Sequence, residues 1–88
     1  MIITEVNIAF IKPKNGLIGF GSLVIDGALY MGNIGIHKIF NAEGHRITYP
    51  TKPMGTRQID VYHPINRTAS DAIHKAIIGR LNEILGDN

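Results

Sequence analysis

The fold is decided by residues 23–30, which read LVIDGALY. An Asp-Gly pair between two apolar runs favours a tight β-hairpin, because both turn positions need a positive φ that Asp and Gly tolerate. The pattern therefore predicts a strand over residues 17–25 and an antiparallel partner over residues 28–40. Gly32 and Gly35 lie inside the second of these strands, where glycine indicates a bulge or the close approach of another backbone.

Further strands are predicted on both sides of this hairpin. Residues 2–11 alternate between a more apolar and a more polar face, and they are followed by Pro13 and by an Asn-Gly pair that favours a turn. Residues 41–44 predict a second hairpin turn, with Gly44 in a left-handed conformation. A fourth strand is expected over residues 45–49, a loop over 50–56, and a short fifth strand over 57–63.

The last part of the chain predicts an α-helix. Thr68 is a candidate N-cap with Asp71 as its acidic partner, and Gly86 is a candidate C-terminal stop. One apolar stripe recurs at helical spacing and consists of Ala72, Ile73, Ala76, Ile77, Leu81, Ile84 and Leu85. We interpret Gly79 as a close-contact position, with simple tolerance of a glycine as the alternative. Ile78 lies off the stripe and offers a second apolar contact that a partner subunit could cover.

Length and composition fit a single domain over residues 1–88 with an α+β fold. We expect an antiparallel sheet of about five strands with the C-terminal α-helix packed on it in two layers. The chain has 88 residues and no cysteine, so neither a disulfide nor a thiolate–zinc site can stabilise it. A domain of this size buries only about 60–65% of its unfolded surface. We therefore expect a homodimer, formed at a sheet edge.

Charge and hydropathy bear on the partner and on the cellular location of the protein. The formal net charge is +2, which permits a nucleic-acid partner but does not require one. No apolar run approaches the roughly 18 residues of a spanning helix, and the N-terminal stretch has no basic segment before its apolar part. We expect a cytoplasmic protein that makes no membrane contact.

The four histidines do not form a convincing site. If Phe40 pairs with His45 across the second hairpin, His37 lies opposite Thr48, so His37 and His45 point to opposite faces and cannot share a metal ion. On a regular strand, Asp60 and His63 also lie on opposite faces, which disfavours a catalytic pair. We expect no metal, no cofactor, no small-molecule substrate and no enzymatic activity.

The basic residues remain as candidates for function. In a twofold dimer, loops from both copies could flank one groove and double the local positive charge, and each phosphate contact would release counterions. Isolated surface cations can also serve solubility alone. The candidate nucleic-acid contacts are Lys52 and Arg57 first, then Arg46, Arg67 and Lys75.

Four segments resemble the SpoVG family, the stage V sporulation protein G or septation regulators. They are SLVID at 22–26, NIGI at 33–36, YPTK at 49–52 and DVYHPIN at 60–66. The resemblance covers roughly residues 3–85 and implies an α+β homodimer that binds DNA site-selectively, and in some members RNA, to regulate gene expression. Pro53 stands where family members usually carry a second basic residue. The alternative is a protein–protein interaction module of the same fold without nucleic-acid binding.

Overall fold

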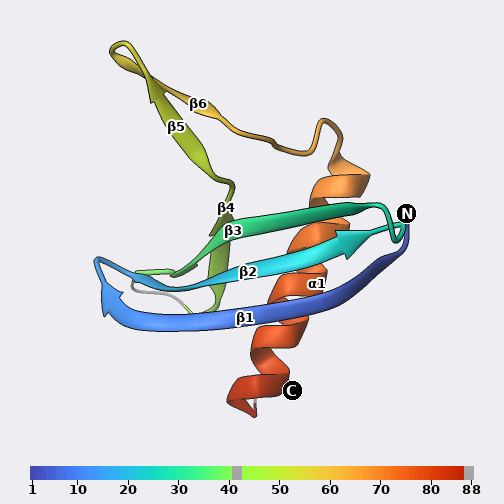
Figure 1. Ribbon diagram of the computed structural model, residues 1–88. Helices are drawn as coiled ribbons and strands as arrows, with labels where there is room; N and C mark the ends of the chain where they lie inside the picture. Colours follow the sequence, from blue (N-terminus) through green and yellow to red (C-terminus); the bar gives the residue numbers. More distant parts are fainter. Residues whose placement is uncertain (41–42, 87–88) are drawn as a thin grey trace.

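The computed structural model describes residues 1–40 and 43–86 and has an α+β architecture (Figure 1). The elements are β1 (Ile3–Lys14), β2 (Leu17–Ile25), β3 (Leu29–Lys38), β4 (His45–Thr48), β5 (Thr51–Met54), β6 (Arg57–Asp60) and α1 (Arg67–Leu85). Strands β1 to β4 form one antiparallel sheet in chain order, and β5 pairs only with β6. The antiparallel sheet followed by a C-terminal helix is confirmed, but the strands divide into a sheet of four and a sheet of two.

The two tight turns of the large sheet have the backbone that their sequences predict. Asn15 and Gly16 have φ values of 52° and 89°, and Asp26 and Gly27 have values of 53° and 62°. Two successive positive φ angles are typical of the hairpin turns whose twist matches that of the flanking strands. Gly44 is also left-handed, with φ of 102°; the other part of that predicted turn, residues 41 and 42, lies outside the described residues.

The pairing of β3 with β4 differs from the predicted register by two residues. His45 pairs with Lys38 rather than with Phe40, and His37 pairs with Arg46 rather than with Thr48. The turn is therefore longer than the four residues that the sequence suggested. Because a shift of two residues keeps each side chain on its face, His37 and His45 still point to opposite sides of the sheet.

The hydrophobic core lies between the four-stranded sheet and α1. Its fully buried side chains come from β2, β3 and α1 and include Leu23, Ile34, Ile36, Ile73, Ile77 and Leu81. The helix approaches the sheet closely at Gly21, where a Cβ atom would lie 2.8 Å from Cδ1 of Ile77. A side chain at this point of β2 would therefore force the Ile77 side chain or the helix to shift.

The ends of α1 correct one prediction and confirm another. The N-cap is Asn66, whose side-chain oxygen accepts a hydrogen bond from the Ala69 backbone N–H at 2.8 Å. The predicted cap, Thr68, is wrong because it already lies inside the helix. The helix ends at Gly86, which has the left-handed φ of 78° and donates its N–H to the last turn, as predicted.

One interpretation within the helix is wrong, and another is confirmed in part. Nothing lies within 4 Å of a Cβ atom placed on Gly79, which is exposed, so this glycine is not a close-contact position. Ile78 is half-buried and packs against the core cluster. The second apolar contact predicted for Ile78 is therefore confirmed, and it is made with the core of the same chain.

Residues 51–60 form a projecting hairpin, which we call the arm (Figure 1). The prediction of a loop over 50–56 is wrong, because Thr51–Met54 is a strand that turns at Gly55 and returns as β6. The fifth strand also ends earlier than predicted, at Asp60 rather than His63. Figure 1 shows the arm reaching away from the sheet and helix.

Two tyrosines at the root of the arm hold it to the body. The Tyr62 hydroxyl donates a hydrogen bond to the Gly32 carbonyl in β3, and the rings of Tyr49 and Tyr62 pack edge to face with centroids 6.0 Å apart. Burial raises the pKa of Tyr62 to about 12, so its hydroxyl remains a donor. These contacts fix the direction in which the arm leaves the sheet.

Candidate nucleic-acid interface

The two leading candidates, Lys52 and Arg57, lie on the same face of the arm. In the arm Lys52 pairs with Ile59, and Met54 pairs with Arg57. Paired residues of an antiparallel ladder share a face, and so do residues two apart along one strand. The pairing therefore brings the two cations, which are five residues apart in sequence, onto one exposed surface.

The opposite face of the arm carries a different set of side chains. Thr51 pairs with Asp60 and Pro53 pairs with Gln58, and the Thr51 hydroxyl donates to the Gln58 side-chain oxygen at 3.3 Å. The arm's single carboxylate within β5 and β6, Asp60, is thus directed away from Lys52 and Arg57. Pro53 also lies on this second face, so a basic residue there would not extend the Lys52–Arg57 surface.

Arg46 lies on the large sheet, on the face opposite α1. It pairs with His37, and burial followed by the nearby Arg46 charge lowers the pKa of His37 below its usual value. His37 Nε2 is 3.0 Å from the Thr48 hydroxyl oxygen. Lys14 extends the same row, since it pairs with Leu17, which pairs with His37. Sequence reasoning missed Lys14 because it follows Pro13 and was assigned to a break between strands.

Arg67 and Lys75 lie on α1 and do not form a continuous basic stripe. At 100° and 1.5 Å per residue they are about 80° apart around the axis and about 12 Å apart along it. The carboxylate of Asp71 lies between them, four residues from each. Another helix cation, Arg80, is bound to Glu83 at 3.1 Å. The helix therefore offers isolated charges rather than one surface.

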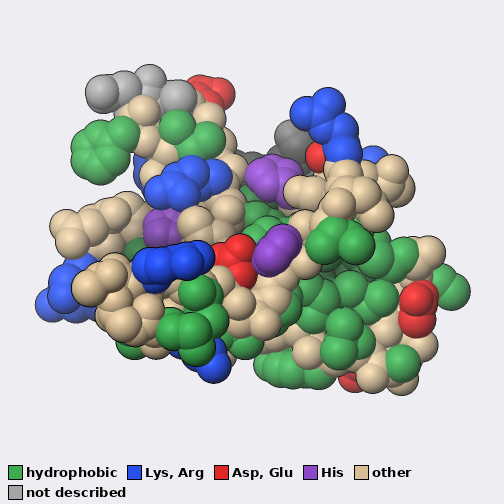
Figure 2. All heavy atoms as spheres, turned by 90° about the horizontal axis from the view of Figure 1, so that it is seen from above, with side chains coloured by type: hydrophobic (Ala, Val, Ile, Leu, Met, Phe, Trp, Pro, Cys, Tyr) green, Lys and Arg blue, Asp and Glu red, His purple; other side chains and the backbone are tan. Residues whose placement is uncertain are grey.

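The structure thus brings together only two of the five candidates, Lys52 and Arg57. Arg46 belongs to the sheet, and Arg67 and Lys75 belong to the helix. Figure 2, which looks down from the side of the arm, shows Lys and Arg side chains in separate places in the left half and at the upper right of the view, with histidines between them. A hydrophobic area occupies the lower right of the same view. One subunit therefore presents a small basic surface on the arm and scattered cations elsewhere.

Asp60 and His63 contact each other, contrary to the sequence prediction. Asp60 Oδ2 lies 3.0 Å from His63 Nδ1. The prediction assumed that the strand continued to residue 63, but β6 ends at Asp60 and the following bend turns His63 back. Both side chains are about half exposed, and Pro64 and Ile65 follow directly. The pair lies at the bend between the arm and the helix.

The described residues give little support for a metal site or for a membrane-spanning helix. Across residues 1–40 and 43–86 there is no group of three or more His, Asp or Glu side chains that could hold a metal ion. In the same part of the chain, no helix has both the length and the apolar character needed to cross a bilayer. The buried Tyr49 hydroxyl has no hydrogen-bond partner among the described residues, and burial raises its pKa.

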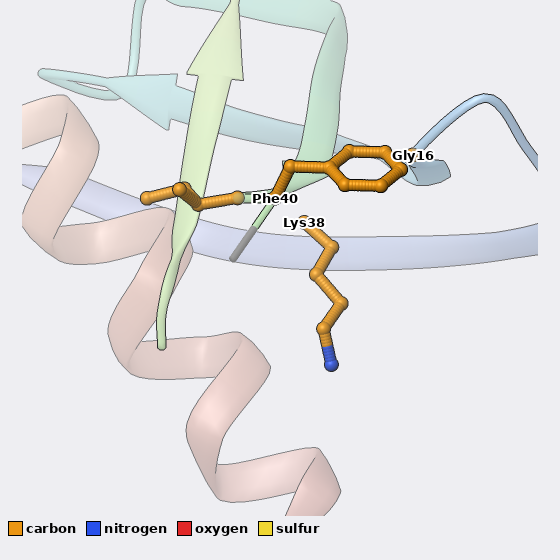
Figure 3. Close-up of a pocket in the computed structure, with 4 residues that line it drawn as sticks. Gly16, Lys38 and Phe40 are labelled. Carbon is orange, nitrogen blue, oxygen red and sulfur yellow. The ribbon is translucent and has the colours of Figure 1, made fainter. Parts of the chain in front are cut away.

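Two hollows are lined mainly by apolar side chains. One, of about 250 Å³, lies at the end of β3 between Gly16, Lys38 and Phe40. Figure 3 shows the Phe40 ring beside Gly16 while the Lys38 side chain extends away. The other is a groove of about 400 Å³ between the β2–β3 turn and the start of α1, with Ile65 89% exposed on its rim. The groove is also lined by the titratable side chains of Tyr30, Tyr62 and His63.

Comparison with protein-family models gives one match, the SpoVG model, over residues 1–83 of the 88-residue chain. The match spans every described strand and all but the last two residues of α1. Comparisons with curated proteins and with solved structures found no match. SpoVG is a regulatory family that is not known for enzymatic activity. The chain therefore belongs to the SpoVG family of sporulation- and septation-related regulators.

Proposed function

We propose that this protein is a dimeric regulator that binds nucleic acid through the Lys52–Arg57 surface of two arms. The observation that carries the proposal is the shared face of these two cations on a projecting hairpin, with Asp60 on the other face. Lys and Arg on such a face contact phosphates, which supplies sequence-independent affinity and positions the protein on its target. Arg57 can also reach a guanine edge.

The arm supports the presence of a second subunit. An isolated two-stranded hairpin is at best marginally stable in water, and most residues of β5 and β6 are exposed. The Val61 N–H donates to the Pro50 carbonyl at 2.8 Å. Backbone groups of successive residues in an antiparallel strand point alternately towards and away from the partner strand. Because Val61 points towards β5, Gln58 and Asp60 direct their N–H and C=O groups outward from β6. The outer edge of β5 has no N–H at Pro53, so β6 is the better edge for pairing.

Pairing of β6 with its copy would gather the cations. Two identical strands in one sheet pair antiparallel when the twofold axis is perpendicular to the sheet, and the same face of each subunit then lies on the same side. Lys52 and Arg57 of both copies would therefore form one four-cation surface. The two Asp60 side chains would lie together on the opposite side.

The test is a double substitution, Lys52→Ala with Arg57→Ala, measured by titration of a fluorescent duplex at several salt concentrations. The slope of log K against log salt is about −0.9 for each neutralised phosphate. Loss of two cations from each of two subunits should flatten the slope by up to about 3.6 and weaken binding, while the thermal transition stays nearly unchanged. Both side chains are exposed, so their removal leaves the core intact.

A matched control removes the same charge elsewhere. Lys12 and Lys38 are exposed and lie at the end of the large sheet, and their double replacement by Ala should change the slope much less. An equal effect of the two double variants would mean that binding depends on net charge and not on the arm. Light scattering on the unmodified protein tests the dimer, and a single subunit at binding concentrations would contradict it.

The alternative function is protein–protein interaction, and one observation favours it. The apolar groove lined by Met1, Leu29 and Ile65 is open to solvent, and such surfaces on small domains mark partner contacts. Retention on heparin and on an immobilised duplex separates the two functions. Elution from both at low salt would support the interaction module and remove nucleic-acid binding.

A further inference from the structure

The sheet face opposite α1 is open, and the pairing registers define what lies on it. Ile34 and Ile36 are buried against the helix, so Gly35 between them and His37 after them belong to the other face. The residues that pair with them on the neighbouring strands lie on the same face, and each set of paired residues forms a row across the sheet. The rows of the open face are Thr4–Val24–Tyr30, Asn7–Ser22, Ala9–Phe20–Gly35–Thr48 and Lys14–Leu17–His37–Arg46.

Two aromatic side chains on this face are accessible to solvent. Phe20 is 37% exposed in the centre of the sheet, and Tyr30 is 70% exposed towards the end of β3. They line one hollow of about 220 Å³ together with Asn33. Phe20 and Asn33 also line a second hollow, of about 400 Å³, on the side of His37. Two adjoining hollows therefore share Phe20 and Asn33 as a common wall.

The backbone of β3 makes room for these hollows. A Cβ atom on Gly35 would collide with the Thr48 hydroxyl, so the absence of a side chain at residue 35 leaves space in the larger hollow. Asn33 has a left-handed φ of 59° at a register shift between β2 and β3. Such bulges redirect a side chain. Here the Asn33 amide, with two donors and one acceptor group, lies beside both hollows.

The paired positions of this face carry two cations at their edge. Lys14 and Arg46 stand at the two ends of one row. At the paired positions of the open face within residues 1–40 and 43–86, there is no Asp or Glu. A flexible polyanion is therefore attracted to the rim of a surface whose centre is aromatic and polar.

We propose that this open face binds single-stranded nucleic acid, with one base stacked on Phe20 and another on Tyr30. The inference rests on the proposed function and specifies its ligand. Stacking on exposed aromatic side chains requires an unpaired base whose flat face is free, whereas the bases of a duplex are already stacked on one another. Asn33 and Thr48 offer hydrogen bonds to base edges, and Lys14 and Arg46 contact the phosphates that flank them.

The experiment compares single-stranded and duplex oligonucleotides of one sequence at fixed salt. Phe20→Leu with Tyr30→Leu keeps apolar volume but removes both rings. Single-strand affinity should fall by about tenfold or more for each stacked base, while duplex affinity and the salt slope remain unchanged. Phe40→Leu, which removes an 83% exposed ring at the far end of β3, is the matched control and should change neither affinity.

The outcomes separate this inference from the proposed function. If the unmodified protein binds neither oligonucleotide, both fail. If it binds duplex but the double leucine variant loses no single-strand affinity, only the stacking fails. If the double variant changes the subunit count in light scattering, the open face is an interface between copies and the inference is overturned.

A second variant reads the stacking directly and does not depend on the folding of the first. The chain has no tryptophan, so Phe20→Trp introduces a single indole on the open face. Base-bearing single strands should quench its fluorescence at concentrations that match binding. An abasic oligonucleotide of equal length, which has the phosphates without the bases, should not. Equal quenching by both would overturn the stacking.

Discussion

The contact between Gly21 and Ile77 gives the sharpest test of how the helix lies on the sheet. A Cβ atom on Gly21 would be 2.8 Å from Cδ1 of Ile77 and 3.5 Å from its Cγ2. Gly21→Ala should therefore be tolerated poorly alone. Ile77→Val removes Cδ1 and leaves Cγ2 at an ordinary contact distance, so each change should relieve the damage that the other causes.

The magnitudes follow from the geometry. Overpacking a core by one methyl group costs about 1–3 kcal/mol, and the lower chain entropy of Ala in the unfolded state returns about 0.4–1 kcal/mol. Ile77 is fully buried, and Ile→Val at such a site costs about 0.5–1.5 kcal/mol. Independent changes would cost about 2 kcal/mol together. With the new methyl filling the vacated space, we expect a cost near 0.5 kcal/mol and a coupling of about 1.5 kcal/mol.

The assay is thermal or urea unfolding of the four proteins of this double-mutant cycle. One kcal/mol corresponds to about 4–8 °C in a domain of this size, so the coupling is readily measured. Gly79→Ala is the matched control, because Gly79 has nothing within 4 Å: it should stabilise by up to about 1 kcal/mol and show no coupling to Ile77→Val. Additive effects of Gly21→Ala and Ile77→Val would refute the packing of α1 over this point of β2.

Two further predictions concern the helix cap and the pH dependence of stability. Asn66→Ala should cost about 1 kcal/mol by removing the cap on Ala69, whereas Thr68→Ala should stay within about 0.5 kcal/mol in urea unfolding; a larger loss for Thr68→Ala would restore it as the cap. The pKa of His37 in the folded protein is below the value of 6.5 that applies to the unfolded chain. As the pH falls through 6.5, the unfolded chain therefore binds a proton more readily than the folded protein, and the melting temperature should decline. His37→Gln should flatten that decline, and an identical pH profile for both proteins would show that other groups cause it.

The local turns could be predicted from the sequence because their chemistry is local. Asn15-Gly16, Asp26-Gly27 and Gly86 all have the positive φ angles that their residue types favour. The helix cap was misplaced because Asn66 and Thr68 are both good capping residues, and the sequence does not show which one adopts the extended conformation. The predicted β3–β4 register was wrong by two residues. A two-residue shift keeps every side chain on the same face of the sheet, so the pattern of apolar and polar residues does not determine the length of the turn.

The sequence predicted only part of the arm: the strand expected over residues 57–63 includes β6, but β5 was assigned to a loop because its residues lack the periodic pattern that burial imposes. No residue of β5 is buried, and Ile59 is the one residue of β6 that is partly buried. Pro53 within β5 also argues against a strand in any central position. The five basic candidates were identified from residue type alone, and only the register of the arm shows that Lys52 and Arg57 share a face while Arg67 and Lys75 remain apart.

The β5–β6 register also changes the interpretation of Pro53. From the sequence, proline at this position is a lost phosphate donor next to Lys52. In the structure residue 53 pairs with Gln58 on the opposite face, so a cation there would not join the basic surface. Proline acts instead on the edge: it removes an outward N–H from β5, while the outward groups of Gln58 and Asp60 in β6 remain complete. The β5 edge of the arm is thereby the weaker edge for strand addition. In the proposed dimer, this would direct a second copy to β6, the side that aligns both pairs of cations.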